Sequence, residues 1–179
     1  MSNARTLAST INSSSQIVVP SGGIAFTDLD SSNDAATANE AYVIGQDGYE
    51  TGSWTPTAIG TSSAGSGTYL AQNGRYTKIG NAVTATAYLN WTAHTGTGNL
   101  KFSGLPFQVL NANNVFYSVS FGLVRNVTLT ANNLMTAHAV FNQTTIAVEQ
   151  YPVGGGASTA VALDTSAEIM YTITYFTND

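Results

Sequence analysis

Residues 115–123 alternate between large apolar and small side chains, and this period of two constrains the fold of the chain more than any other feature. On a period of two, Ser118, Ser120 and Gly122 fall on one face, and the other face carries Val115, Tyr117, Val119, Phe121 and Leu123. Successive side chains of a β-strand point to opposite faces of its sheet, so the pattern predicts a strand. One face of this strand should be buried and the other open.

Similar short segments, separated by Gly- and Asn-rich turns, fill the chain from residue 53 onward. We expect further long strands at residues 82–91, 134–141, 144–151 and 168–176, and shorter ones at 54–59, 68–71, 75–79 and 100–102. Turns should fall at Gly- or Asn-containing positions, namely residues 72–74, 80–81, 96–98, 110–114, 126, 132–133, 142–143 and 154–156. This spacing predicts an all-β fold, an antiparallel β-sandwich of jelly-roll type over residues 53–179.

Residues 1–52 contain only short apolar pieces, which Ser, Gly and Pro interrupt. Such pieces are too short to bury a core of their own. We interpret this region as an extended N-terminal arm that becomes ordered when it docks on a larger assembly; the alternative is a terminus without a role. The apolar arm residues expected to dock are Leu7, Ile11, Ile17, Val18, Val19, Pro20, Ile24 and Phe26.

The small number of charges limits the partners of the chain. Lys and Arg together number 5 and the net charge is −5, whereas nucleic-acid binding needs clustered basic residues. Cysteine is absent from the sequence, which excludes disulfides and thiolate metal sites. No apolar run reaches the length of a membrane span, and the first residues lack the pattern of a secretion signal. We expect a protein made in the cytoplasm, with neither a nucleic-acid nor a membrane partner.

The sequence offers little to build a catalytic or metal site. His94 and His138 lie in no motif with a nucleophile. We expect His138 to be structural, and His94 to be a loop residue whose ring caps nearby backbone. Asp164 and Glu168 show no sign of forming an acid–base pair. The acidic stretch at residues 28–34 lacks the Gly and Glu of a calcium loop. We therefore predict no enzymatic activity, no cofactor and no metal.

The predicted last strand, residues 168–176, has large side chains on both faces. Every second residue from Ile169 to Tyr175 suits a sandwich core, whereas Met170 and Phe176 point the other way. An uncharged apolar face usually marks an interface, which favours oligomerisation. The alternative is a central strand that the fold of the same chain covers on both sides.

One set of blocks is more specific, and it spans about residues 49 to 107. The blocks are Glu50–Pro56, Gly67–Tyr69, Gly74–Asn81, Gly96–Leu100 and Gly104–Phe107. In their order and spacing they resemble a β-rich module of tailed-phage virion structural proteins, found in head-decoration, fibre and tailspike proteins. The residues from 108 onward show only a generic β pattern.

The resemblance implies a homotrimer and a location in the virion. We interpret the chain as a capsid decoration or cement protein, whose arm docks on the major capsid protein and whose sandwich projects as a trimeric knob. The alternative is a short tail fibre or host-attachment protein whose knob loops bind a host-surface glycan. The residues expected between subunits are Arg75, Tyr76, Lys78, Met170 and Phe176.

Overall fold

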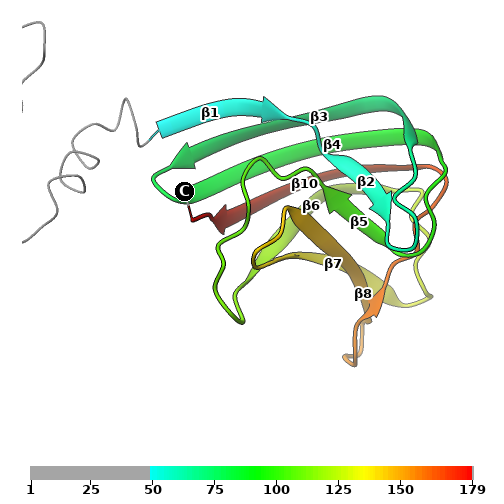
Figure 1. Ribbon diagram of the computed structural model, residues 1–179. Helices are drawn as coiled ribbons and strands as arrows, with labels where there is room; N and C mark the ends of the chain where they lie inside the picture. The colour runs from blue at the N-terminus through cyan, green and yellow to red at the C-terminus, as the bar shows by residue number, and fades with distance from the viewer. Residues whose placement is uncertain (1–48, 179) are drawn as a thin grey trace, which may run out of the picture. The chain divides into compact units, whose positions relative to one another are not determined.

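The computed structural model describes residues 49–178, which form ten β-strands and no helix (Figure 1). All strand pairs are antiparallel. The strands are β1 (Tyr49–Trp54), β2 (Thr57–Gly60), β3 (Gly67–Ile79), β4 (Ala82–His94), β5 (Leu100–Ser103), β6 (Phe116–Arg125), β7 (Asn133–Val140), β8 (Thr145–Pro152), β9 (Thr159–Ala160) and β10 (Ala167–Phe176). The predicted all-β antiparallel class is confirmed, and the arm residues of the prediction lie outside the described part of the chain.

The strands follow one hydrogen-bonded path in the order β1-β3-β4-β10-β6-β7-β8-β5-β2, with β9 beside β8. The path bends at β6 into two layers, because residues Val119–Arg125 of this strand pair with β10 and residues Phe116–Ser118 pair with β7. The first layer holds β1, β3, β4 and β10, and the second holds β7, β8, β5 and β2 (Figure 1). We use "outer face" for the side of the first layer that points away from the second.

The core lies between the layers and follows from the period of two. Each second residue of β4 and of β10 is buried, from Val83 to Trp91 and from Ala167 to Tyr175. The second layer supplies Phe102, which stacks on the Tyr171 ring with their centroids 4.7 Å apart. Burial of such apolar area contributes roughly 25 cal/mol per Å² and is the main stabilising term for a fold without disulfides.

One expected strand and one expected turn were wrong, and each has a specific physical reason. The strand expected at residues 54–59 is divided into β1 and β2 at Thr55–Pro56, because Pro has no N–H to donate to a ladder. The turn expected at residues 72–74 does not exist, because β3 continues through it. A Cβ on Gly74 would lie 2.4 Å from Nε1 of Trp54, so this glycine makes room for an indole rather than for a turn.

The alternation at residues 115–123 is confirmed over most of its length. Tyr117, Val119 and Phe121 are half-buried and pack against the core. The register with β10 then shifts, so that Phe121 pairs with Tyr171 and Leu123 pairs with Met170. Gly122 is thereby left without a partner of its own, as in a β-bulge. The first strand also begins at Tyr49, within the region assigned to the arm.

Two core tyrosines of β10 differ in how their hydroxyls are satisfied. The Tyr175 hydroxyl accepts a hydrogen bond from the Phe107 amide at 3.2 Å and donates one to the Phe107 carbonyl at 3.1 Å. The buried Tyr171 hydroxyl has no hydrogen-bond partner among the described residues. Burial raises the pKa of Tyr175 to about 12, and it raises the pKa of Tyr171 well above its usual range.

Removal of the two hydroxyls should have opposite effects on stability. Tyr171→Phe deletes a buried polar group that gains no hydrogen bond, so we expect the free energy of unfolding to rise by about 1 kcal/mol. Tyr175→Phe removes two hydrogen bonds, and we expect a fall of about 1–2 kcal/mol. Chemical denaturation of the two variants at neutral pH measures both values. Equal effects of the two substitutions would contradict this account.

The same tyrosines predict a loss of stability at alkaline pH. Above pH 10, roughly the pKa of an exposed tyrosine, the unfolded chain releases these protons while the folded chain retains them. Stability should therefore be constant below this pH and should fall as the pH rises towards about 12, the folded-state pKa of Tyr175. Melting temperatures between pH 8 and pH 12 test this. The fall should be smaller in Tyr171→Phe.

Candidate functional site

The outer face of the first layer is a regular array of polar side chains. On β4 the outward residues include Thr84, Thr86 and Tyr88, which alternate with buried residues. On β10 the corresponding residues include Thr172 and Thr174. The Oγ1 atoms of Thr84 and Thr174 lie 3.0 Å apart and share a hydrogen bond. The array follows from the buried alternation, since the inward residues determine which residues face outward.

The strand register places these side chains in rows that cross the sheet. Directly paired residues of antiparallel strands share a face, with Cβ atoms about 5 Å apart. One row contains only exposed residues, four of which carry hydroxyls, and it consists of Ser53, Arg75, Thr86, Thr172 and Ser120. The next row consists of Asn73, Tyr88, Met170 and Leu123. A hydroxyl-rich row thus lies beside a row with aromatic and apolar side chains.

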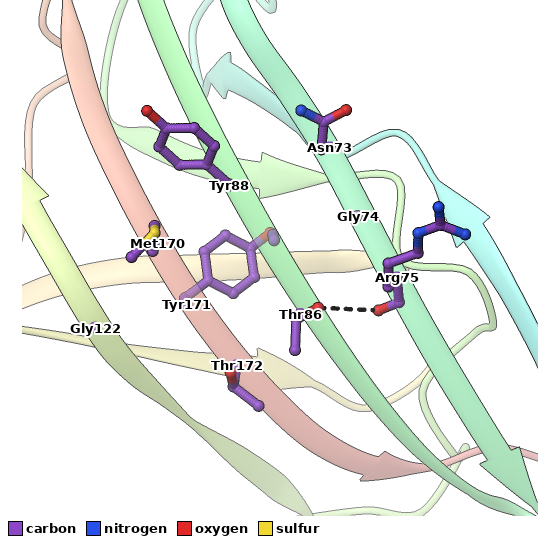
Figure 2. A pocket seen from close by; sticks show the side chains of 10 residues that line it. Asn73, Gly74, Arg75, Thr86, Tyr88, Gly122, Met170, Tyr171 and Thr172 are labelled. Atoms are coloured by element: carbon purple, nitrogen blue, oxygen red, sulfur yellow. Dashed lines mark hydrogen bonds between the residues drawn. The ribbon is translucent and has the colours of Figure 1, made fainter.

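A hollow of about 390 Å³ lies over these two rows and is our candidate site (Figure 2). We call it the outer-face hollow. Its polar lining includes Asn73, Arg75, Thr86 and Thr172, and its apolar lining includes Met170. Figure 2 shows Asn73 and Arg75 on β3, with Tyr88 and Met170 on the neighbouring strands β4 and β10. A second hollow of about 250 Å³, the edge hollow, shares Asn73, Gly74 and Arg75 with the first and extends to Ser53 and Thr55 of the β1 end.

Tyr88 is held in place by a short chain of polar contacts. Its hydroxyl donates to Oε1 of Glu168 at 2.8 Å, and Nη1 of Arg125 donates to Oε2 of the same carboxylate at 3.2 Å. Across the hollow, a Cβ built on Gly122 would meet no atom within 4 Å, so the space beside this glycine is open. The ring of Tyr88 is therefore fixed beside a free volume.

Trp54 packs against Gly74 and lines the edge hollow. Nε1 of Trp54 donates to the backbone oxygen of Thr86 at 3.1 Å and so ties β1 to β4 beneath β3. Trp54 and Gly74 are also directly paired between β1 and β3. A side chain at position 74 would displace the indole. Gly74 itself lies in the lining of both hollows.

Arg75 lies at the junction of the two hollows, and its side chain is exposed. Its backbone oxygen accepts a hydrogen bond from Oγ1 of Thr86 at 3.5 Å. Among residues 49–178, no hydrogen bond or ion pair joins its guanidinium to another residue. The five N–H donors of this group are available to a ligand.

The five residues predicted between subunits do not share one face. Arg75, Met170 and Phe176 lie on the outer face. Tyr76 and Lys78 point to the opposite side of β3, where Nζ of Lys78 lies 5.1 Å from the centroid of the Phe107 ring and Tyr76 packs edge-on against that ring. The Tyr76 hydroxyl donates to Glu50, and this hydrogen bond raises the pKa of Tyr76. Whether any of the five contacts another subunit stays a prediction.

The histidines and carboxylates considered in the sequence have structural partners. Nδ1 of His94 accepts from the Gly96 amide at 2.9 Å, so Nε2 carries the proton that it donates to the Ala58 oxygen at 2.9 Å. The bond with Gly96 is the predicted cap of nearby backbone, but His94 is the last residue of β4 and not a loop residue as expected. His138 packs edge-on against Phe116. Asp164 accepts hydrogen bonds from the Thr128 amide and hydroxyl, at 2.7 Å and 2.9 Å.

Residues 49–178 show neither a metal centre nor a membrane-spanning helix. No group of three or more His, Asp or Glu side chains in residues 49–178 is arranged to hold a metal ion. The same residues contain no helix long and apolar enough to cross a bilayer. The docking residues of the predicted arm, from Leu7 to Phe26, lie outside the described part of the chain.

The site residues predicted from the sequence did not include Asn73, Thr86, Tyr88, Gly122 and Thr172. The alternation within residues 82–91 and 168–176 does place Thr86, Tyr88 and Thr172 on one side of their strands. The alternation does not reveal which strands are neighbours. In the structure β10 pairs with β4 and β6, and these pairs join residues more than forty positions apart.

The fold is shared with part of a phage protein. No family model and no curated protein matches the chain. The crystal structure of the Dettilon tailspike protein contains a similar fold, with a TM-score of 0.55 and 20% sequence identity over 72% of this chain and 24% of the tailspike chain. This chain therefore spans about a quarter of the length of that tailspike. At this identity the likeness shows a common fold.

Proposed function

We propose that this chain is a host-attachment component of a phage tail and that its outer-face hollow binds a surface saccharide. The observation that carries the proposal is a hollow with Asn, Thr and Arg side chains around a fixed tyrosine, on a module with the fold of part of a tailspike. The saccharide lies on the sheet face in this proposal, rather than on loops as the sequence suggested.

The lining of the hollow suits a sugar ring. Sugar hydroxyls both donate and accept hydrogen bonds, and the amide of Asn73 and the hydroxyls of Thr86 and Thr172 do the same. The apolar C–H face of a sugar ring needs an apolar or aromatic surface, which Tyr88 and Met170 supply. A few convergent polar groups around an apolar surface are typical of small-ligand sites.

Capsid decoration, our first interpretation of the sequence, has less support than attachment. It depended on docking of the arm residues on a shell, and these residues lie outside the described part of the chain. The similar fold belongs to a tailspike, which favours a tail location. The copy number of this chain in the particle separates the two functions, since a decoration protein covers the shell and a tail component is present in few copies.

Trimerisation is part of the proposal, because one shallow hollow gives weak binding and several linked hollows give avidity. An apolar row at one end of the outer face supports self-association: Tyr49, Ile79 and Phe176 are 49%, 54% and 42% exposed, and Ala82 joins them in the register.

The native mass of the protein tests trimerisation. We expect a native mass of three chains of 18.6 kDa. The double substitution Ile79→Ser with Phe176→Ser should lower this native mass, because it removes two side chains of the apolar row. A wild-type monomer at micromolar concentration would contradict trimerisation.

Removal of the Tyr88 ring tests the saccharide site. We expect the full chain to bind one or more members of an array of bacterial surface polysaccharides, and Tyr88→Ala to weaken that binding about tenfold through loss of the stacking surface. Tyr151→Ala is the matched control, because Tyr151 is a partly exposed tyrosine of β8 in the other layer. Its binding should equal that of the wild type.

Two outcomes would contradict the saccharide site. Absence of binding to every polysaccharide on the array removes the proposed function. Equal losses in Tyr88→Ala and Tyr151→Ala move the site away from the outer-face hollow. Thermal unfolding of both variants checks that the fold is retained.

A further inference from the structure

We infer that the bound saccharide carries an anionic substituent, a carboxylate or a phosphate, and that the guanidinium of Arg75 binds it. The inference rests on the proposed function and adds the chemical class of the ligand. It starts from the charge around the two hollows that Arg75 joins. Among the described residues, no Asp or Glu lines either hollow, whereas Arg75 lines both.

The other basic side chains of the described part have partners or an acidic neighbour. Arg125 forms an ion pair with Glu168 at 3.2 Å. Lys78 lies over the Phe107 ring. Lys101 lines a third hollow together with Glu149, which supplies a compensating carboxylate there. Among residues 49–178, Arg75 is thus the basic residue that combines an exposed position in a hollow with the lack of an acidic residue in its lining.

A guanidinium that has no partner among residues 49–178 favours an anion over a neutral group. Its planar donors match a carboxylate or a phosphate with two parallel hydrogen bonds, and such charge-assisted bonds are roughly twice as strong as neutral ones. The chain as a whole has a net charge of −5, so its overall field does not attract anions. Binding of an anionic sugar therefore needs a local positive group, and Arg75 provides one.

The arrangement also sets the orientation of the ligand. Asn73 and Arg75 lie on the β3 side of the outer-face hollow, and Tyr88 and Met170 lie towards the sheet centre (Figure 2). A sugar ring over Tyr88 directs a charged substituent towards β3, where the edge hollow begins. The edge hollow is lined by Ser53, Thr55 and Gln72, which suits a neighbouring sugar unit of the same chain.

The test uses the full chain and the polysaccharides that it binds on the array. Each bound polysaccharide is measured untreated, after reduction of its carboxylates to alcohols, and after removal of its phosphates with hydrogen fluoride. We expect one of the two treatments to weaken binding roughly 10- to 100-fold, the usual range for loss of a hydrogen-bonded charge. The effective treatment identifies the anion as a carboxylate or a phosphate.

Variants of Arg75 connect that loss to the proposed group. Arg75→Gln should weaken binding of the untreated polysaccharide by the same factor and should show no further loss after the effective treatment. Arg75→Lys keeps the charge but not the planar donors. Its affinity for the untreated polysaccharide should lie between that of the wild type and that of Arg75→Gln. Lys101→Gln is the matched control, because it removes one positive charge at the third hollow, away from the proposed site. This variant should bind the polysaccharide as the wild type does.

The outcomes separate the inference from the function on which it rests. Binding that neither treatment weakens, or that Arg75→Gln leaves unchanged, overturns the anionic ligand while the saccharide site stands. An equal loss in Arg75→Gln and Lys101→Gln reduces the effect to net charge and also overturns it. Absence of binding to any polysaccharide removes the proposed function and the inference together.

Discussion

The ladder between β4 and β10 is the interaction on which the rest of the structure depends. It pairs ten residues of each strand without a break, from Ala167 with Trp91 to Phe176 with Ala82. Because side chains alternate between faces, this single register places Leu89, Ile169 and the other inward residues of the two strands in the core. It places Thr86, Tyr88 and Thr172 on the outer face. A slip of one residue would exchange the two sets, so the core that stabilises the sheet also positions the candidate site.

The fold class was predictable from the sequence because it depends on local patterns. Alternation and turn residues are visible in a single strand, and most strands of the sandwich lie where they were expected. The division of the expected strand at Pro56 is a local effect, but two other failures depend on a contact between distant residues. Gly74 has the sequence context of a turn residue, but in the structure it makes room for the Trp54 indole. Leu123 continues the alternation in the sequence, but the bulge at Gly122 pairs it with Met170 of the outer face.

The candidate site was much less predictable, for the same physical reason. Thr86, Tyr88 and Thr172 are ordinary strand residues in the sequence, and only the register brings them to one place. Arg75 was singled out, but as a residue between subunits. Among the described residues no carboxylate lines either of the two hollows that Arg75 joins. This property depends on the folded lining and appears in no stretch of sequence.

The two faces of the first layer differ in how strictly they restrict substitution. Inward residues such as Leu89 and Ile173 are fully enclosed, so a change of size there affects the packing of both layers. Outward residues such as Thr84 and Thr174 contact mainly their neighbours across the strands, and the ladder beneath them is maintained by backbone bonds. The outer face can therefore diverge while the scaffold beneath it persists. Under the attachment function proposed above, a few surface substitutions would be enough to change the ligand.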